Sequence, residues 1–147
     1  MRRHPLARAT RMDKSSIAGL AATLRHYARG EATEEVPVWR MIAVRPEELE
    51  ARAGAMAKTI GSSATVAPGT SAMGGGSLPG DSMETRLVSL DPSHLSGGAE
   101  ELAHRLRTGT PAIMARIEAG RILLDPRTVP PARDADVAAA VRTALEA

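Results

Sequence analysis

The chain has 147 residues, a formal net charge of +2 and 43% hydrophobic residues, with no Phe and no Cys. This length suits one ordinary domain, and the absence of cysteine excludes disulfides, a thiolate metal site and a cysteine nucleophile. With one Trp and one Tyr, the chain has too few aromatic rings for a base-stacking platform that binds nucleic acid.

The amino-terminal residues carry no sign of a membrane or secretory segment. No apolar run approaches the length of a membrane span, and the basic residues Arg2 and Arg3 are not followed by the apolar region of a signal peptide. We therefore expect a cytoplasmic protein without a membrane partner.

A first helix is predicted over residues 15–29. Asp13, Ser15 and Ser16 are all favourable N-cap types, and Gly30 can take the left-handed conformation that commonly ends a helix. Between them, apolar side chains recur at helical spacing: Ile17, Leu20, Leu24 and Tyr27.

Two more helices are predicted before the first strand. Pro37 can occupy the first turn of a short helix, in which Trp39 is most simply a packing anchor. Pro46 begins the next helix, where acidic residues follow in the first turn. The buried face of that helix is marked by three residues: Leu49, Ala53 and Met56.

The first two strands are predicted on either side of a flexible stretch. A short β-rich segment surrounds Thr65 and Val66, and a second strand is predicted over residues 85–90. Residues 68–81 between them are rich in Gly, Ser and Pro, which favours a loop.

Residues 110–129 predict a β-hairpin, on which we expect the sheet to be built. Alternate positions are apolar, which is typical of strands with one buried face: Ile113, Ala115, Ile117, Ile122 and Leu124. The chain reverses at Ala119 and Gly120, where glycine allows a positive φ. Pro126 lacks a backbone donor and ends the second strand.

Two further helices complete the pattern. One is predicted over residues 96–107, with Leu102 and Leu106 on its buried face, and the last is capped by Asp134. The element order alternates hairpin-connected strands with helices. This order predicts an α+β fold, an antiparallel sheet with helices on one face.

Most residues whose side chains could bind a metal, a phosphate or a cofactor are better explained by a structural role. The histidines lack metal-ligand spacing, so we expect no metal site. The glycines that begin at Gly74 are not followed by the Lys-Ser or Lys-Thr of a phosphate-binding loop. Nothing in the pattern indicates a pocket that would desolvate Lys14 as a Schiff-base lysine.

Arg8 and Arg11 lie three residues apart, just before a predicted helix N-terminus. Two guanidinium groups in front of a helix dipole can bind an oxyanion such as phosphate. From spacing alone, a solvated basic tail is the more frequent explanation. Both interpretations stand at this point.

Several blocks of the sequence together resemble bacterial L-seryl-tRNA(Sec) selenium transferases. They occur in the order of that family and cover most of the chain. Their sequences are HPLARATRMDK (4–14), LRHYARGE (24–31), EVPVWRMI (35–42), GGGSLPG (Gly74–Gly80), TPAIMARIEAGRILLD (110–125) and RTVP (127–130).

The resemblance implies a pyridoxal-phosphate (PLP) enzyme of the aspartate-aminotransferase-like fold. Members convert seryl-tRNA(Sec) to selenocysteinyl-tRNA(Sec) through a dehydroalanyl intermediate, with selenophosphate as the selenium donor. The chain would be only the carboxy-terminal portion. Residues 1–44 would then be the end of the large domain with a connecting helix, and residues 45–147 the small C-terminal α+β domain.

The same resemblance implies roles for few residues of this chain. Arg8 and Arg11 match family arginines associated with the anionic selenium donor. The Schiff-base lysine and the cofactor-binding segments lie upstream in the family. We therefore expect no catalytic, cofactor-binding or metal-binding residue here, no covalently bound PLP, and no activity of this chain alone.

Three interpretations remain open. The first is a portion of a selenium transferase that works with a missing amino-terminal domain or with other subunits. The resemblance implies a homo-oligomer. The second is a non-catalytic binding or assembly domain, whose partner surface would be the apolar face of the helix at residues 15–29. The third is a fragment of a related PLP-dependent lyase or transferase.

Overall fold

The computed structural model describes residues 11–73 and 82–147. The chain divides into two compact units, Met1–Ala43 and Val44–Ala147. Arg8 and the segment from Gly74 to Gly80 lie outside the described residues. Within the described ranges, no helix is both long enough and apolar enough to cross a membrane.

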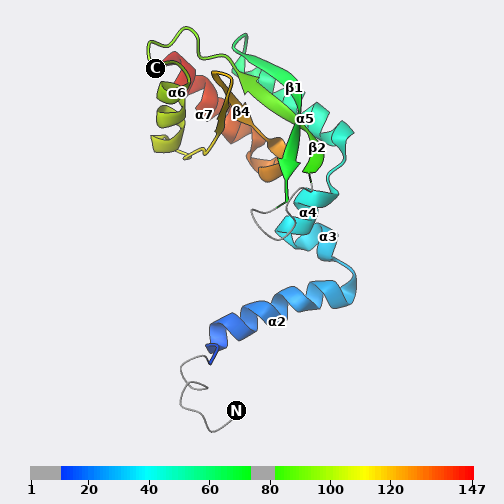
Figure 1. Ribbon diagram of the computed structural model, residues 1–147. Coiled ribbons are helices and arrows are strands. Elements are labelled where there is room, and N and C mark those ends of the chain that lie inside the picture. Colours follow the sequence, from blue (N-terminus) through cyan, green and yellow to red (C-terminus); the bar gives the residue numbers. More distant parts are fainter. Residues whose placement is uncertain (1–10, 74–81) are drawn as a thin grey trace. The chain divides into compact units, whose positions relative to one another are not determined.

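The first unit is helical where it is described. It contains α2 (Lys14–Arg29), α3 (Ala32–Glu35) and α4 (Pro37–Ala43). Figure 1 shows α2 as one uninterrupted helix. Gly30 ends it with a φ of 74°, as predicted, and of the three candidate N-cap residues Asp13 is the one that caps it.

Trp39 is not the buried anchor that the sequence predicted. Its side chain in α4 is 40% exposed, and its indole Nε1 donates a hydrogen bond to the hydroxyl of Tyr27 in α2. The two aromatic rings of the chain thus pair at the surface of the first unit.

The second unit is α+β. In the described residues its elements are α5 (Pro46–Ile60), β1 (Ala64–Ala72), β2 (Ser82–Leu90), α6 (Gly98–Thr108), β3 (Arg116–Glu118), β4 (Arg121–Leu124), the short 3₁₀ helices η1 (Pro126–Thr128) and η2 (Pro131–Arg133), and α7 (Asp134–Glu146).

The described strands form one four-stranded sheet in the order β1-β2-β4-β3, and every neighbouring pair is antiparallel. The predicted antiparallel α+β fold is confirmed. The loop predicted from residue 68 is wrong up to Ala72, because β1 continues through Pro68. An edge strand tolerates proline because its outer side needs no ladder hydrogen bonds.

The predicted hairpin is present but contributes unequally to the sheet. Ala119 and Gly120 both have positive φ, 49° and 74°, which matches the two-residue turn whose twist suits a hairpin. β4 is central, whereas β3 is a three-residue edge strand whose residues are all exposed. Ile113 lies outside the strand and is nevertheless buried. The longer β2, rather than the hairpin, is the strand that joins the two halves of the sheet.

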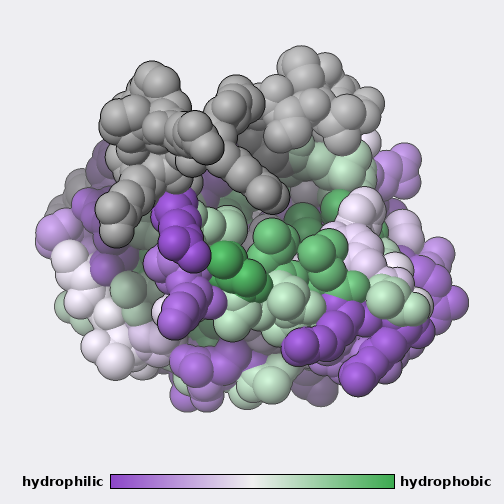
Figure 2. Space-filling model, turned by 90° about the horizontal axis from the view of Figure 1, so that it is seen from below, coloured by the Kyte–Doolittle hydropathy of each residue, from purple (hydrophilic) through white to green (hydrophobic). Residues whose placement is uncertain are grey.

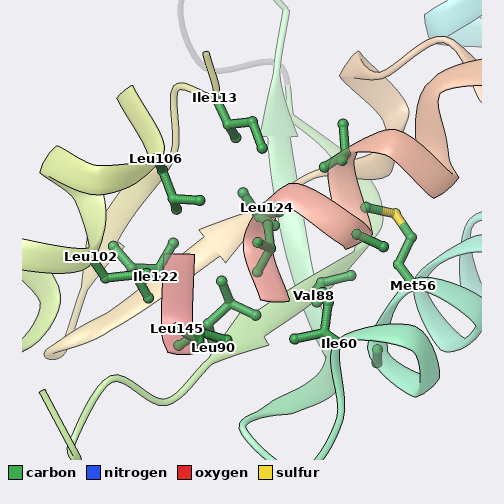
Figure 3. Close-up of a cluster of buried hydrophobic side chains, with 14 of the residues drawn as sticks. Met56, Ile60, Val88, Leu90, Leu102, Leu106, Ile113, Ile122, Leu124 and Leu145 are labelled. Atoms are coloured by element: carbon green, nitrogen blue, oxygen red, sulfur yellow. The ribbon is translucent and has the colours of Figure 1, made fainter. Parts of the chain in front are cut away.

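One apolar core holds the second unit together. Val88 and Leu90 of β2 pair in register with Leu124 and Ile122 of β4, which places all four on one face of the sheet. Figure 3 shows these side chains pointing toward residues of the three helices α5, α6 and α7. The buried face predicted for α5 is confirmed, since Leu49, Ala53 and Met56 are all buried.

The start of α7 differs from the prediction. The residue that precedes the helix is Arg133, and Asp134 is its first residue rather than its cap. Both carboxylate oxygens of Asp134 accept hydrogen bonds from Arg52 of α5. The carboxylate is therefore used to join two helices and not to cap one.

Candidate functional site

The basic segment before α2 is the site that the sequence predicted. Arg11 is exposed and lies in irregular backbone two residues before the N-cap. Among the residues that the structure describes, none forms a hydrogen bond or ion pair with its guanidinium. No described group therefore competes with an anion for its five donors.

The N-terminus of α2 itself is already occupied by an internal carboxylate. Asp13 accepts a hydrogen bond of 2.9 Å from the backbone N–H of Ser16 and one of 2.6 Å from its hydroxyl. Both hydrogen bonds lower the pKa of Asp13 below its usual value of 3.8, and the bond from the hydroxyl has the larger effect. The helix dipole therefore stabilises Asp13, and an external anion would depend on the arginine side chains.

The lysines of the chain do not fit a Schiff-base site. Lys14 is the first residue of α2 and Lys58 lies in the last turn of α5, and both are exposed. A lysine that forms a Schiff base is normally activated by desolvation or by a neighbouring cation in a pocket. The described surroundings of Lys14 and Lys58 provide no such burial.

The described histidines have separate surroundings. The Nδ1 of His26 is 3.2 Å from Glu31, the Nε2 of His94 is 3.0 Å from the carbonyl of Leu145, and His104 is exposed on α6. Within residues 11–73 and 82–147, no three His, Asp or Glu side chains are grouped as metal ligands would be.

The periodicity of the sequence did not predict the polar network around Asp125 in the second unit. Its Oδ1 accepts hydrogen bonds from Thr85 Oγ1 at 2.9 Å and from the backbone N–H of Arg127 at 3.0 Å. Its Oδ2 accepts a hydrogen bond from the hydroxyl of Ser71. One carboxylate thus joins β1, β2 and η1, and Thr85 is completely buried.

Arg127 extends this network. Its side chain is 4% exposed, and it donates to the carbonyl oxygens of Glu84 at 2.6 Å and Val44 at 3.2 Å. The guanidinium therefore fixes the chain that enters α5 against the start of β2. The available signal in the sequence was an Asp-Pro-Arg run directly after a buried strand.

Arg52 and Asp134 form a third polar link. Arg52 donates two hydrogen bonds of 2.8 Å to the carboxylate of Asp134 and another of 2.8 Å to the carbonyl of Val129. The hydrogen bonds to Asp134 raise the pKa of Arg52. This bidentate pair holds α7 beside α5.

Two pockets of the second unit lie beside polar side chains that are hydrogen-bonded within the chain. A pocket of about 390 Å³ lies between the ends of α6 and α7, where Arg105 donates to Glu101 and to the carbonyl of Ala144. A smaller one, about 230 Å³, borders Asp125 and Ser71. Neither pocket contains a residue that the sequence marked for function.

Comparison with known proteins gives a consistent family signal. The family model of L-seryl-tRNA selenium transferase matches residues 1–130. Three relatives described as L-seryl-tRNA(Sec) selenium transferase illustrate the similarity. The protein from Nitratidesulfovibrio vulgaris is 41% identical over 152 aligned positions, which cover 99% of this chain and 32% of the relative.

The other two relatives agree. The protein from Carboxydothermus hydrogenoformans is 36% identical over 134 positions, covering 88% of this chain and 28% of the relative. That from Moorella thermoacetica is 39% identical over 150 positions, covering 97% of this chain and 32% of the relative. The chain thus spans less than a third of the length of these relatives.

The Asp125 network predicts a strong effect of substitution on stability. Asp125→Ala removes the acceptor of the buried Thr85 hydroxyl, so we expect the second unit to lose about 2–3 kcal/mol in its free energy of unfolding. Urea denaturation measures this loss. Asp136→Ala is the matched control, because the Asp136 carboxylate is 57% exposed in its ion pair with Arg133 and its removal should cost less than about 0.5 kcal/mol. Equal losses for the two variants would contradict a structural role for Asp125.

The cap of α2 predicts a pH dependence with a definite sign. Because the pKa of Asp13 is lower in the helix than its usual 3.8, ionised Asp13 stabilises α2 above that pH, and this stabilisation is lost as the pH falls through the lowered pKa. NMR chemical shifts of α2 should therefore report less helix in acid. Asp13→Asn keeps a good cap and should flatten this dependence, whereas an unchanged acid transition would show that another group is responsible.

Proposed function

Because the chain belongs to the L-seryl-tRNA selenium transferase family, we propose that it is the carboxy-terminal portion of an enzyme that converts seryl-tRNA(Sec) to selenocysteinyl-tRNA(Sec) with selenophosphate. The observation that carries this proposal is the family match over residues 1–130, supported by 36% to 41% identity to the relatives. The complete activity would need the larger part of the enzyme, since these relatives are much longer than the chain.

The two parts of this chain would belong to different domains of that enzyme. Residues 45–147 would form the small C-terminal domain of an aspartate-aminotransferase-like PLP enzyme, and residues 1–44 would end the large domain and connect the two. The antiparallel sheet with helices on one face supports this assignment. We place the complete enzyme in the cytoplasm, as a homo-oligomer.

PLP is the cofactor that the family resemblance implies, and when bound it supplies an electron sink for elimination chemistry. The exposed Lys14 and Lys58 do not fit its covalent attachment. We therefore assign the cofactor to the remaining part of the enzyme, and we expect the 147-residue chain alone to be inactive.

Within this chain, Arg8 and Arg11 would bind the selenium donor. Selenophosphate is an oxyanion, and guanidinium groups bind such anions through charge-assisted, often bidentate hydrogen bonds. The exposure of Arg11 and its freedom from any described carboxylate support this role. Asp13, whose charge is held by Ser16, does not neutralise the guanidinium through a direct contact.

The role of the arginines is tested in a chimeric enzyme in which this chain replaces the matching region of the Nitratidesulfovibrio vulgaris relative. Arg11→Gln removes hydrogen bonds worth about 1.5–3 kcal/mol, so we expect the KM for selenophosphate to rise roughly 10- to 150-fold. The KM for seryl-tRNA(Sec) should stay constant. The assay follows formation of selenocysteinyl-tRNA(Sec) while each substrate is varied.

Arg8→Gln should act in the same direction, and Arg142→Gln provides the control, because Arg142 is an exposed arginine on α7. An unchanged KM for selenophosphate in both Arg8→Gln and Arg11→Gln would refute the anion-binding role. A chimera that forms no selenocysteinyl-tRNA(Sec), although it is folded and contains PLP, would count against the proposed function itself.

The assignment of the cofactor has its own test. The purified chain is titrated with PLP, treated with borohydride and examined by intact mass. We expect no stoichiometric adduct, because both lysines are exposed. A specific adduct on Lys14 or Lys58 would overturn the assignment of the cofactor to another part of the enzyme.

A further inference from the structure

One face of α2 is apolar and uncovered. Its four large side chains follow the spacing of three and four residues that aligns them on one side of a helix. Their exposed fractions are similar: Ile17 51%, Leu20 50%, Leu24 55% and Tyr27 47%. Figure 2 shows hydrophobic residues at the surface of the molecule, bordered by strongly hydrophilic ones. These four residues are called the α2 stripe below.

The first unit has almost no core to stabilise this helix. None of the 16 residues of α2, all of them described, is buried. In the described part of the unit only Val36 is buried, at 9% exposure. An isolated helix of this length is marginal in water, so α2 requires a surface on which the stripe is covered.

The composition of the surface indicates protein as the partner. Tyr27 and Trp39 pair through a hydrogen bond, and Val38 beside Trp39 is 55% exposed. Tyr and Trp are enriched among the residues that dominate binding energy at protein interfaces. The stripe is therefore joined, within the same unit, by a second group of exposed apolar side chains.

The charged residues of α2 lie away from the stripe. α2 carries Lys14, Arg25 and Arg29 and contains no acidic residue. Of these, only Arg29 forms an ion pair within the described residues, with Glu31 at 4.0 Å. By helical spacing these basic residues lie on the side of α2 that carries Ala18 and Ala22, opposite the stripe, so the surface that covers the stripe itself is expected to be apolar.

We propose that the α2 stripe docks onto the part of the selenium transferase that lies outside this chain. This inference rests on the proposed function and adds the partner surface. The family match includes all of α2, and the chain spans only 28% to 32% of the relatives' length. The larger remainder of such a protein is therefore available to cover the helix.

The first measurement compares amide hydrogen exchange of α2 in the isolated chain and in the chimeric enzyme. In the isolated chain, α2 amides should exchange rapidly while amides of β2 and β4 are protected by their core. In the chimera, α2 amides should be protected at least about 10-fold more. Strong protection of α2 in the monomeric isolated chain would overturn the proposal, and this result does not depend on any variant folding.

Two double variants test the face itself. Leu20→Glu with Leu24→Glu places two charges on the stripe, and should abolish the added protection of α2 in the chimera. Ala18→Glu with Ala22→Glu is the matched control, with the same spacing and the same charges on exposed positions of the opposite side of the helix. Equal loss of protection in both double variants would refute docking through the stripe.

The remaining outcomes separate the alternatives. Sedimentation that shows a dimer of the isolated chain, with α2 protected only at high concentration, would mean that a second copy covers the stripe, and would overturn the proposal. Docking is measured by hydrogen exchange and catalysis by formation of selenocysteinyl-tRNA(Sec), so the two can fail separately. Protected α2 amides in a chimera without transferase activity would support the docking while the proposed function fails.

Discussion

The burial of one face of the sheet under three helices is the constraint on which the rest of the second unit depends. Val88 and Leu90 are completely buried, and so are their neighbours Leu102 of α6 and Ile122 of β4. Side chains of this kind each contribute about 1.5–3 kcal/mol when removed from water. Since the chain has no Phe, these buried aliphatic residues are the main source of stability of the second unit. Their burial also determines which face of β2 points inward.

The opposite face of the sheet is organised by polar contacts. Thr85 and Ser89 alternate with the core residues of β2 and point away from the helices, yet both are buried. Thr85 donates to Asp125 and Ser89 accepts from Arg121 at 2.6 Å. Buried hydroxyl groups need such partners because unpaired ones destabilise the fold. The turn after β4 is thereby tied to the sheet by hydrogen bonds of defined geometry, in addition to apolar packing.

The two units differ in how far their own contacts stabilise them. The second unit has a continuous core with polar links such as Arg52–Asp134, as expected of a domain that folds independently. The described part of the first unit has the reverse character, with apolar side chains of α2 and α4 at its surface. Exposed apolar faces of this kind often mark interaction sites, which supports the proposal that α2 docks through its stripe.

Local patterns in the sequence were sufficient for most of the longer helices, the order of the strands along the chain and the family. Asp13 and Gly30 bound α2, and Ala119 with Gly120 form the turn, because capping and turn geometry depend on residues adjacent in the chain. The extension of β1 to Ala72, the pairing of Asp134 with Arg52 and the convergence of Ser71, Thr85 and Asp125 were decided only by the tertiary structure. These side-chain contacts of Asp134 and Asp125 join residues 40 to 82 positions apart, and helical or strand periodicity carries no information about which distant partners meet. The same limit applies to α2, where spacing predicted an apolar face but only the structure showed that it is exposed.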